Sequence, residues 1–298
     1  MPRPTTKKEG GANGRPVSDG VGWEVPRPFL KWAGGKGQLV PTLLELVPPK
    51  FKVYHEPFVG GGALFFALER QCHLKRARLS DINPELIDTS CALRDQVEEV
   101  IACLELHPYD QDYYYAIRSL RPGDLPLAER AARMIYLNRS GFNGLYRVNT
   151  RGGFNVPFGR HKNPRLCDHK NLRAASAALQ GVEIRAEPFE AARRAGLGDL
   201  VYFDPPYVPV SDTAKFVGYA QDGFSLADQE RLAEVFVALA DRGVHVLLSN
   251  SDTPAVRRLY RGFRAVELQA RRSVNSRSDR RGPVAELVVC SPGLAGRR

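Results

Sequence analysis

The sequence predicts an α/β protein with a parallel-rich, doubly wound sheet and an inserted, mainly helical segment. Short apolar runs alternate with stretches of helical periodicity, and strands that alternate with helices pair in parallel. The alternation stops between about 110 and 180, where two helical patterns flank a loop rich in Gly, Asn and Arg. With 298 residues, 43% of them apolar, the chain can bury one large core and carry a smaller inserted domain.

Each element follows from its hydrophobic period and its flanking residues. Strands are expected at 53–55, 78–80, 182–184, 200–203, 244–248 and 287–289. Helices are expected at 63–70, 84–106, 225–242 and 253–260, and within the insert at 125–138 and 168–179. We therefore divide the chain into a flexible tail at 1–25, a main domain formed by 26–109 and 181–292, and an inserted domain at 110–180.

The composition excludes several classes of protein. Five cysteines without a Cys-x-x-Cys pair and six histidines without His-Glu-x-x-His provide no framework for disulfides or zinc, so we expect a cytoplasmic protein without a metal. No apolar run follows Lys7 and Lys8, and no run of about 18 apolar residues occurs. Neither a secretion signal nor a membrane span is expected. Nothing in the sequence demands an oligomer, and we expect a monomer.

The net charge of +10 is concentrated in two segments. Residues 138–173 hold eight Lys or Arg against Asp168 alone, and residues 257–281 hold nine Arg against Glu267 and Asp279. Basic residues gathered in this way are typical of a surface that binds nucleic acid. A solvated charged face is the alternative.

The sequence Asp204-Pro205-Pro206-Tyr207 directly follows the apolar run 200–203. Two prolines force a rigid turn at the end of a buried strand, which is where open α/β sheets bind ligands. The Asp204 carboxylate and a proline carbonyl are acceptors for an amino group, and the Tyr207 ring offers a flat surface for stacking. The four residues together predict a site for a planar amine.

A second candidate site is the glycine cluster Gly60-Gly61-Gly62 between an expected strand and helix. Glycines there let the backbone approach a ligand, and Asp81, at the end of the next strand, is placed to bind ribose hydroxyls. This pattern favours a nucleoside, while a plain tight turn remains the alternative. The segment Phe29 to Gly37 is a third cluster, in which Trp32 can pack on an adenine and Lys36 can neutralise a carboxylate, or the segment can simply cap the next helix.

Taken in order, these motifs resemble the Dam-type DNA adenine methyltransferases. The resemblance runs from about 28 to 290, and the cofactor loop, recognition insert and Asp-Pro-Pro-Tyr follow one another as in the family's α-type arrangement. It is carried by residues 29–37, 56–62, 80–83, 137–147, 154–160 and 204–207. The resemblance implies a Rossmann-like methyltransferase sheet, with 26–109 and 181–292 as its catalytic domain and 110–180 as its target-recognition domain.

The resemblance further implies S-adenosylmethionine as methyl donor. Its pocket would be lined by Trp32, Lys36, Phe58, Gly60, Asp81 and Asp204. The catalytic residues would be Asp204, Pro205, Pro206 and Tyr207. Asp204 and the Pro205 carbonyl would accept the two N–H bonds of an adenine amino group and direct its lone pair at the methyl. The adenine would have to be flipped out of the duplex, with Tyr207 stacking on it.

Recognition of double-stranded DNA is expected from the insert together with Lys31. Arg147 is suited to a bidentate contact with guanine, and Leu145 and Pro157 to contact with a thymine methyl. The full set of expected DNA-binding residues is Lys31, Phe142, Asn143, Leu145, Arg147, Pro157, Arg160 and His161, and the family's matching stretch reads GATC. Val156 and Phe158 are expected to be core residues.

Three other functions remain open at this point. An RNA or protein amino-methyltransferase would use the same Asp-Pro-Pro-Tyr but would not need residues 143–160. A DNA-binding module without catalysis would not need Asp81 and Asp204. A nicotinamide oxidoreductase would give no role to Asp204 to Tyr207. Two loops complete the expectations. Residues 208–224 would close as a lid over the base, and the basic segment 271–283 would order on phosphate.

Overall fold

A computed structural model of the chain describes residues 25–32, 34, 37–71, 73–207, 224–271 and 283–294. Lys36, residues 1–24 of the predicted tail, residues 208–223 of the predicted lid and residues 272–282 of the predicted phosphate-binding segment lie outside the described residues. No helix within the described ranges combines the length and the apolar surface needed to cross a membrane.

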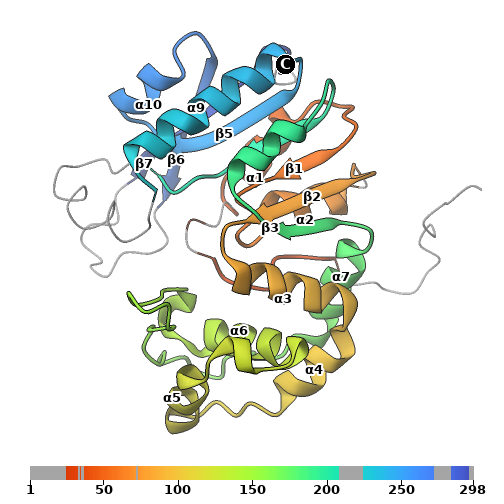
Figure 1. Cartoon of the computed structure of the whole chain (residues 1–298), viewed down its shortest axis with the longest axis vertical. Coiled ribbons are helices and arrows are strands. Elements are labelled where there is room, and N and C mark those ends of the chain that lie inside the picture. Colours follow the sequence, from red (N-terminus) through yellow and green to blue (C-terminus); the bar gives the residue numbers. More distant parts are fainter. Residues whose placement is uncertain are drawn as a thin grey trace, which may run out of the picture.

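Seven strands form one sheet in the order β3-β2-β1-β4-β5-β7-β6 (Figure 1). The first five are mutually parallel, and β7 runs antiparallel to both neighbours. The strands are β1 (Tyr54–Glu56), β2 (Ala77–Asp81), β3 (Glu183–Ala186), β4 (Leu200–Phe203), β5 (His245–Ser251), β6 (Arg264–Arg271) and β7 (Pro283–Cys290). The parallel-rich sheet predicted from the sequence is confirmed.

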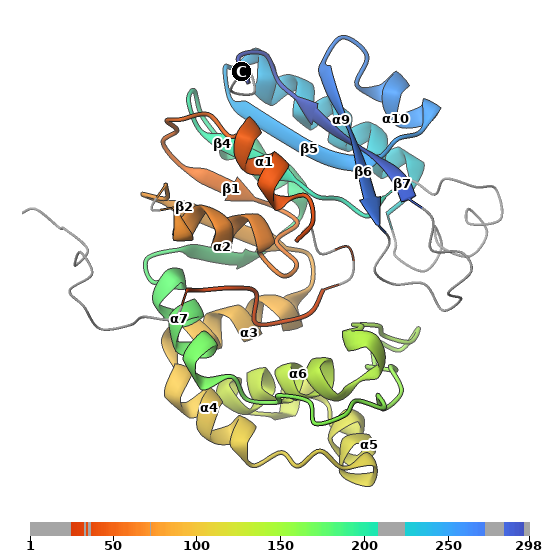
Figure 2. The same cartoon turned by 180° about the vertical axis from the view of Figure 1, so that it is seen from behind.

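The central strand β4 is buried on both faces of the sheet. Its side chains alternate, so Leu200 and Tyr202 join the core beneath α1 (Val40–Leu46) and α2 (Ala63–Arg70), which Figure 2 shows on the near face. Val201 and Phe203 join a second core beneath α9 (Leu226–Asp241), on the face seen in Figure 1, together with α10 (Pro254–Leu259) and the 3₁₀ helix η3 (Phe189–Arg194). The continuous apolar run of β4 therefore reflects a strand covered by helices on both sides.

The helical part of the molecule lies beyond the β3 edge of the sheet (Figure 1). It is centred on α6, which packs against α3 and α4. Its elements are α3 (Pro84–Asp95), α4 (Val97–Glu105), α5 (Gln111–Ser119), η1 (Pro122–Asp124), α6 (Leu127–Ser140), η2 (Phe142–Gly144) and α7 (His169–Leu179).

The single helix predicted over 84–106 is wrong. Gln96 leaves the helical conformation, with φ −141° and ψ 43°, and separates α3 from α4. The bend allows Val100, Ile101 and Leu104 to be buried in the same core as α6. Apolar spacing alone does not reveal it, since both halves have helical periodicity.

Two α-helices and a strand are absent from the sequence prediction. Helix α1 is short, with Pro41 in its first turn and Pro48 shortly after its end. Helix α5 is rich in tyrosine and is capped by Asp110, which accepts a 2.8 Å hydrogen bond from Tyr113 N. Strand β6 is at the edge of the sheet, where Arg264 and Glu267 are exposed and only weak alternation remains.

The first described segment ties the sheet to the helical part. Arg27 N donates to Asn171 Oδ1 at 3.1 Å, and the Lys31 backbone exchanges hydrogen bonds of 2.8 and 2.7 Å with the Asn138 side chain. The Arg139 guanidinium donates to the Phe29 carbonyl at 2.8 Å. Residues 27–31 therefore lie against α6 and α7.

Arg133 is the largest side chain buried in the helical part, at 2% exposure. Its guanidinium donates to Glu85 Oε1 at 2.8 Å and to the carbonyls of Ile117 and Arg118, each at 3.1 Å. One side chain thus joins α3, α5 and α6. Burial lowers the pKa of Arg133, and the Glu85 carboxylate opposes this shift.

Replacing Arg133 by Met should destabilise the fold strongly. The change leaves Glu85 without its cation and two carbonyls without a donor, so we expect a loss of about 3–5 kcal/mol in the free energy of unfolding. Arg173→Met is the matched control, because its ion pair with Glu98 is exposed and its loss should change stability far less. Urea unfolding measures the free energy of unfolding of both variants. Equal losses would show that the buried Arg133–Glu85 pair contributes no more to stability than the exposed pair.

Candidate functional site

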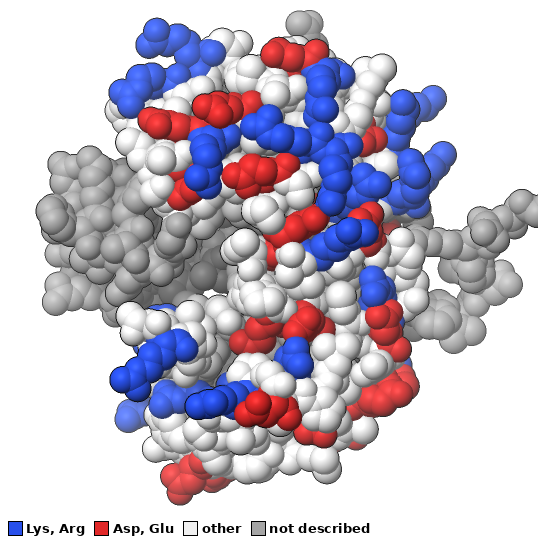
Figure 3. All heavy atoms as spheres, viewed as in Figure 1, with Lys and Arg blue, Asp and Glu red and all other residues white. Residues whose placement is uncertain are grey.

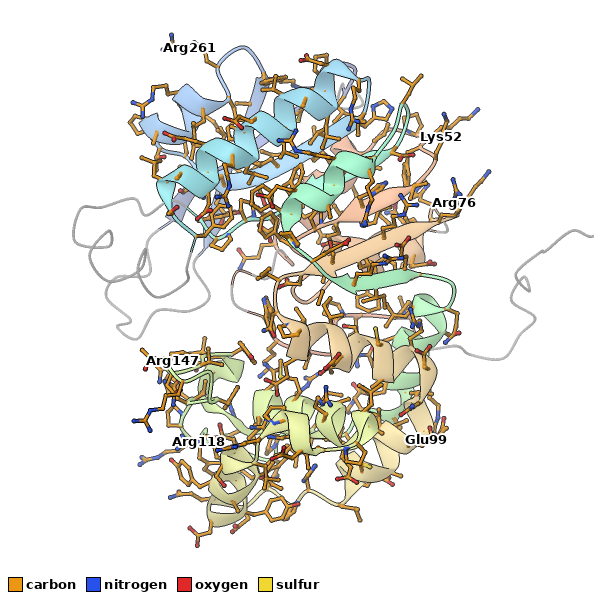
Figure 4. The ribbon with its side chains drawn as sticks, in the orientation of Figure 1. Lys52, Arg76, Glu99, Arg118, Arg147 and Arg261 are labelled. Carbon is orange, nitrogen blue, oxygen red and sulfur yellow. The ribbon has the colours of Figure 1, made fainter. Side chains whose placement is uncertain are left out.

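Because β1, β2, β4 and β5 are parallel, their carboxyl ends meet at one edge of the sheet. Glu56, Asp81, Asp204 and Ser249 come from these ends. In Figure 4, Arg147 lies on the helical part towards this side, whereas Lys52 and Arg76 precede β1 and β2 and lie at the opposite end. Figure 3 shows Lys and Arg side chains of the helical part gathered on the same side.

A chain of hydroxyls fixes Asp204. Ser249 Oγ donates to Asp204 Oδ1 at 2.7 Å, and Tyr202 Oη lies 2.9 Å from Ser249 Oγ. Since the serine has a single hydroxyl proton, Tyr202 donates to Ser249, which donates to Asp204. The carboxylate is therefore held in one orientation by a neighbouring strand.

The turn after Asp204 is anchored from two further elements. Pro205 is buried, and the Pro206 carbonyl accepts a 2.9 Å hydrogen bond from Gln229 of α9. Asn250 donates to Gln229 Oε1 at 3.1 Å. Tyr207 Oη donates to Glu286 Oε2 of β7 at 2.9 Å, and burial raises the tyrosine's pKa far above its ordinary value. The segment after Asp204 is thus fixed to α9 and to the sheet.

Glu56 is a buried carboxyl at the end of β1, at 3% exposure. Tyr54 Oη donates to it at 2.9 Å. Burial raises the pKa of Glu56 to about 8; the Asp204 charge adds to this rise, and the Tyr54 hydrogen bond opposes it. Glu56 therefore keeps its proton at neutral pH, directly before the glycine cluster.

The glycine cluster lies beside Asp81 and Trp32. Gly60 has φ +46°, and its N–H donates to Asp81 Oδ2 at 3.2 Å, while Asn83 N donates to Oδ1 at 3.0 Å. A Cβ at Gly60 would lie 2.7 Å from Cδ1 of Trp32, so only glycine fits there. Burial raises the pKa of Asp81, and these backbone hydrogen bonds oppose the rise.

Phe58 has a different environment from these residues. Its ring stacks on Phe189 at 5.6 Å and meets Phe203 and Phe224 edge-on at 6.4 and 5.7 Å. The structure thus brings Trp32, Gly60 and Asp81 together, while the half-buried Phe58 packs against the core beneath α9. All four remain predictions as donor-binding residues, as does Lys36.

We call residues 141–161 the recognition element. Phe142 is 45% exposed at its start, and Asn143 adopts φ +55°. The chain returns in a hairpin, with bridges from Val148 to Phe154 and from Gly141 to Phe158. Arg147 donates through Nε to Asn155 Oδ1 at 2.6 Å and through Nη2 to the Asn155 carbonyl at 3.1 Å.

The recognition element gathers the eight residues expected to bind DNA. Lys31 joins it because its side chain packs against Gly144, where an added Cβ would lie 2.5 Å from Lys31 Cδ. The Pro157 carbonyl accepts a 2.9 Å hydrogen bond from Phe142 N, and Leu145 is half-buried. A cavity of about 370 Å³ is lined by Phe142, Asn143, Phe158, Arg160 and His161. Val156 is fully buried, as predicted, and Phe158 is half-buried against the core.

Sequence reasoning missed the residues that support the turn and the carboxylate. Ser249 and Asn250 lie at the end of β5, which was expected to stop at residue 248. Gln229 is a polar residue on the buried face of α9, at 1% exposure. A polar residue on an otherwise apolar helix face was the available signal, since buried polar groups require partners.

A sheet with a reversed β7, a glycine cluster after β1 and an acid-proline turn after β4 define the class of Rossmann-like methyltransferases. The family model of the D12 class N6 adenine-specific DNA methyltransferases matches residues 32–274. The chain belongs to this family.

Curated relatives agree with this assignment. A protein named Type II methyltransferase M1.LlaDCHI, from Lactococcus lactis subsp. cremoris, is 42% identical over 90% of this chain and 96% of its own length. A DNA adenine methylase of Vibrio cholerae is 38% identical over 88% of this chain and 95% of its own. Among solved structures, the N-methyltransferase NodS from Bradyrhizobium japonicum WM9 aligns with a TM-score of 0.36 and 12% identity, over 86% of this chain and 95% of its own.

The buried Glu56 predicts that stability falls as pH rises. Its ordinary pKa is 4.5 and its value in the folded chain is about 8, so the folded state holds a proton that the unfolded state releases between these values. Unfolding then releases a proton, and stability decreases through that window by more than about 1 kcal/mol. Thermal unfolding between pH 5 and pH 8.5 measures the slope.

Glu56→Gln should flatten this slope, because an amide stays neutral and can still accept from Tyr54. The control is Glu99→Gln, an exposed glutamate on α4 (Figure 4), which should leave the slope unchanged. An unaltered slope in Glu56→Gln would assign the pH dependence to other groups.

Proposed function

We propose that this adenine-specific DNA methyltransferase transfers the methyl group of S-adenosylmethionine to N6 of an adenine flipped out of double-stranded DNA, within GATC. The observation that carries the proposal is the orientation of the Asp204 carboxylate by Ser249. Asp204 follows β4, which lies between β1, ending in Glu56, and β5. A carboxylate held in this way can accept a hydrogen bond from an amino nitrogen.

Asp204 and the Pro205 carbonyl accept the two N–H bonds of the adenine amino group. The nitrogen lone pair is delocalised into the ring, and these contacts localise it on the side that faces the donor. After transfer, Asp204 can take the proton that the nitrogen loses. Gln229 holds the Pro206 carbonyl and so keeps the turn that presents Pro205 in place.

The residues beside the glycine cluster fit a nucleoside donor. Asp81 is a partly buried acceptor at the end of β2, suited to ribose hydroxyls, and the Gly60 backbone has no side chain to keep a ligand away. Trp32 offers an indole face for packing, with Lys36 and Phe58 as further pocket residues. The donor itself supplies a methyl group on a sulfonium, which is the electrophile of the reaction.

Recognition of GATC rests on the recognition element and Lys31, within an inserted target-recognition domain at 110–180. Asn155 holds two donors of the Arg147 guanidinium, so Arg147 presents its plane in a fixed direction for a guanine edge. Phe142 is exposed beside a cavity, suited to filling the space that the flipped adenine leaves. Tyr207 stacks on the base while its hydroxyl stays on Glu286.

Expression in a host that lacks adenine methylation tests the function. The DNA should become resistant to an endonuclease that cuts only unmethylated GATC and sensitive to one that cuts only the methylated form. Asp204→Ala should leave the DNA unmodified, because the amino group loses its acceptor. Unmodified GATC with methyladenine at other sequences would retain the enzyme class and reject the specificity.

Arg147→Ala should relax specificity at one base pair. We expect a loss of about 10- to 100-fold in discrimination against substitutions at that pair, which corresponds to about 1–3 kcal/mol. Arg151→Ala, at the exposed tip of the same hairpin, is the control and should weaken all sequences alike. Methylation rates on GATC duplexes with single-base changes measure the difference; equal discrimination in both variants would remove Arg147 from base readout.

A further inference from the structure

Tyr146 lies between Leu145 and Arg147 in the recognition element, and its ring packs against Trp32. It is half-buried and packs against the core. Its ring stacks on Trp32, with centroids 5.2 Å apart and planes inclined by 23°. An edge contact with Phe154 at 5.7 Å joins it to the returning arm of the hairpin. Tyr146 therefore contacts both arms of the recognition element and the indole beside the glycine cluster.

The Tyr146 hydroxyl makes a second contact, with α3. It donates to Glu85 Oε2 at 3.1 Å, while Glu85 Oε1 accepts from Arg133. Glu85 belongs to the first turn of α3, which starts three residues after Asp81. Burial and the Glu85 charge both raise the pKa of Tyr146, so the hydroxyl stays protonated and remains a donor.

These contacts form a closed path between the two parts of the molecule. Tyr146 stacks on Trp32, Trp32 lies against Gly60, and the Gly60 N–H donates a hydrogen bond to Asp81. It returns from Asp81 through the start of α3 to Glu85 and the Tyr146 hydroxyl. A shift of the glycine cluster or of Asp81 thus moves Trp32 and Glu85, the two residues that contact Tyr146 of the hairpin.

We propose that Tyr146 is a positioning residue that couples donor binding to DNA binding. The inference rests on the proposed function, because it takes Trp32, Gly60 and Asp81 as the donor pocket and 141–161 as the DNA contact. Donor binding fixes Trp32 and the start of α3, and Tyr146 transmits this to Leu145 and Arg147. Coupling of this kind is reciprocal, so DNA must tighten donor binding by the same factor.

The coupling factor is measured with a short GATC duplex and sinefungin, a donor analogue without a transferable methyl. Fluorescence anisotropy gives the duplex Kd with and without sinefungin, and calorimetry gives the sinefungin Kd with and without duplex. We expect a factor on the order of ten in the wild type, within the usual range for coupled sites. Tyr146→Leu should reduce it to below about two while changing each separate Kd by less than about threefold.

Two variants separate positioning from simple packing. Tyr146→Phe keeps the stack on Trp32 and loses the Glu85 bond, so an intermediate factor is expected. Tyr115→Leu removes an exposed tyrosine of α5, which contacts Arg118 and Tyr114, and should keep the full factor. A residue needed only for folding would raise both separate Kd values and leave the coupling factor unchanged.

The outcomes distinguish this inference from the function on which it rests. A full coupling factor in Tyr146→Leu, or no coupling in the wild type while GATC is methylated, overturns the role of Tyr146 alone. Failure of the wild type to bind sinefungin overturns the proposed donor pocket and the inference with it.

Discussion

Parallel pairing of the central strands is the constraint on which the rest of the structure depends. Parallel strands require crossovers, and the crossovers cover both faces of the sheet, so β4 must be apolar on both sides. Polar groups of these strands can then reach a ligand only at the strand ends. The same pairing places β1, β2, β4 and β5 with their carboxyl ends together. The acid-proline turn, the glycine cluster and the hydroxyl chain from Tyr202 are therefore neighbours, although they are far apart in the sequence.

Local signals in the sequence predicted those elements whose residues decide their own conformation. Helix α2 and strand β4 were predicted with the bounds that the structure gives them, because a glycine cluster and a pair of prolines mark their limits. The bend at Gln96 and the edge strand β6 were missed. Both depend on what packs against them, and a single sequence does not contain that information. The insert boundaries at 110 and 180 stay a prediction.

For the site, sequence reasoning identified groups with distinctive chemistry and missed the residues that orient them. Asp81, Gly60 and Trp32 were predicted to share a donor pocket; Gly60 lies against both Asp81 and Trp32, and the pocket itself stays a prediction. The Phe58 side chain was assigned to that pocket by resemblance, and its ring packs with three other phenylalanines. Ser249 and Gln229 carry no motif, and their roles depend on the register of β4 with β5 and on the angle of α9. This register and this angle are properties of the folded chain, so local sequence patterns do not reveal them.

The segment 27–31 has a consequence for how the molecule folds. It leads directly to Trp32, yet its hydrogen bonds go to Asn138 and Asn171, residues 107 and 144 positions away in the chain. Contacts this distant in sequence form only after long loops have closed, and they slow folding. Trp32 can therefore take its place beside Gly60 only when α6 and α7, which hold residues 27–31, are present and packed.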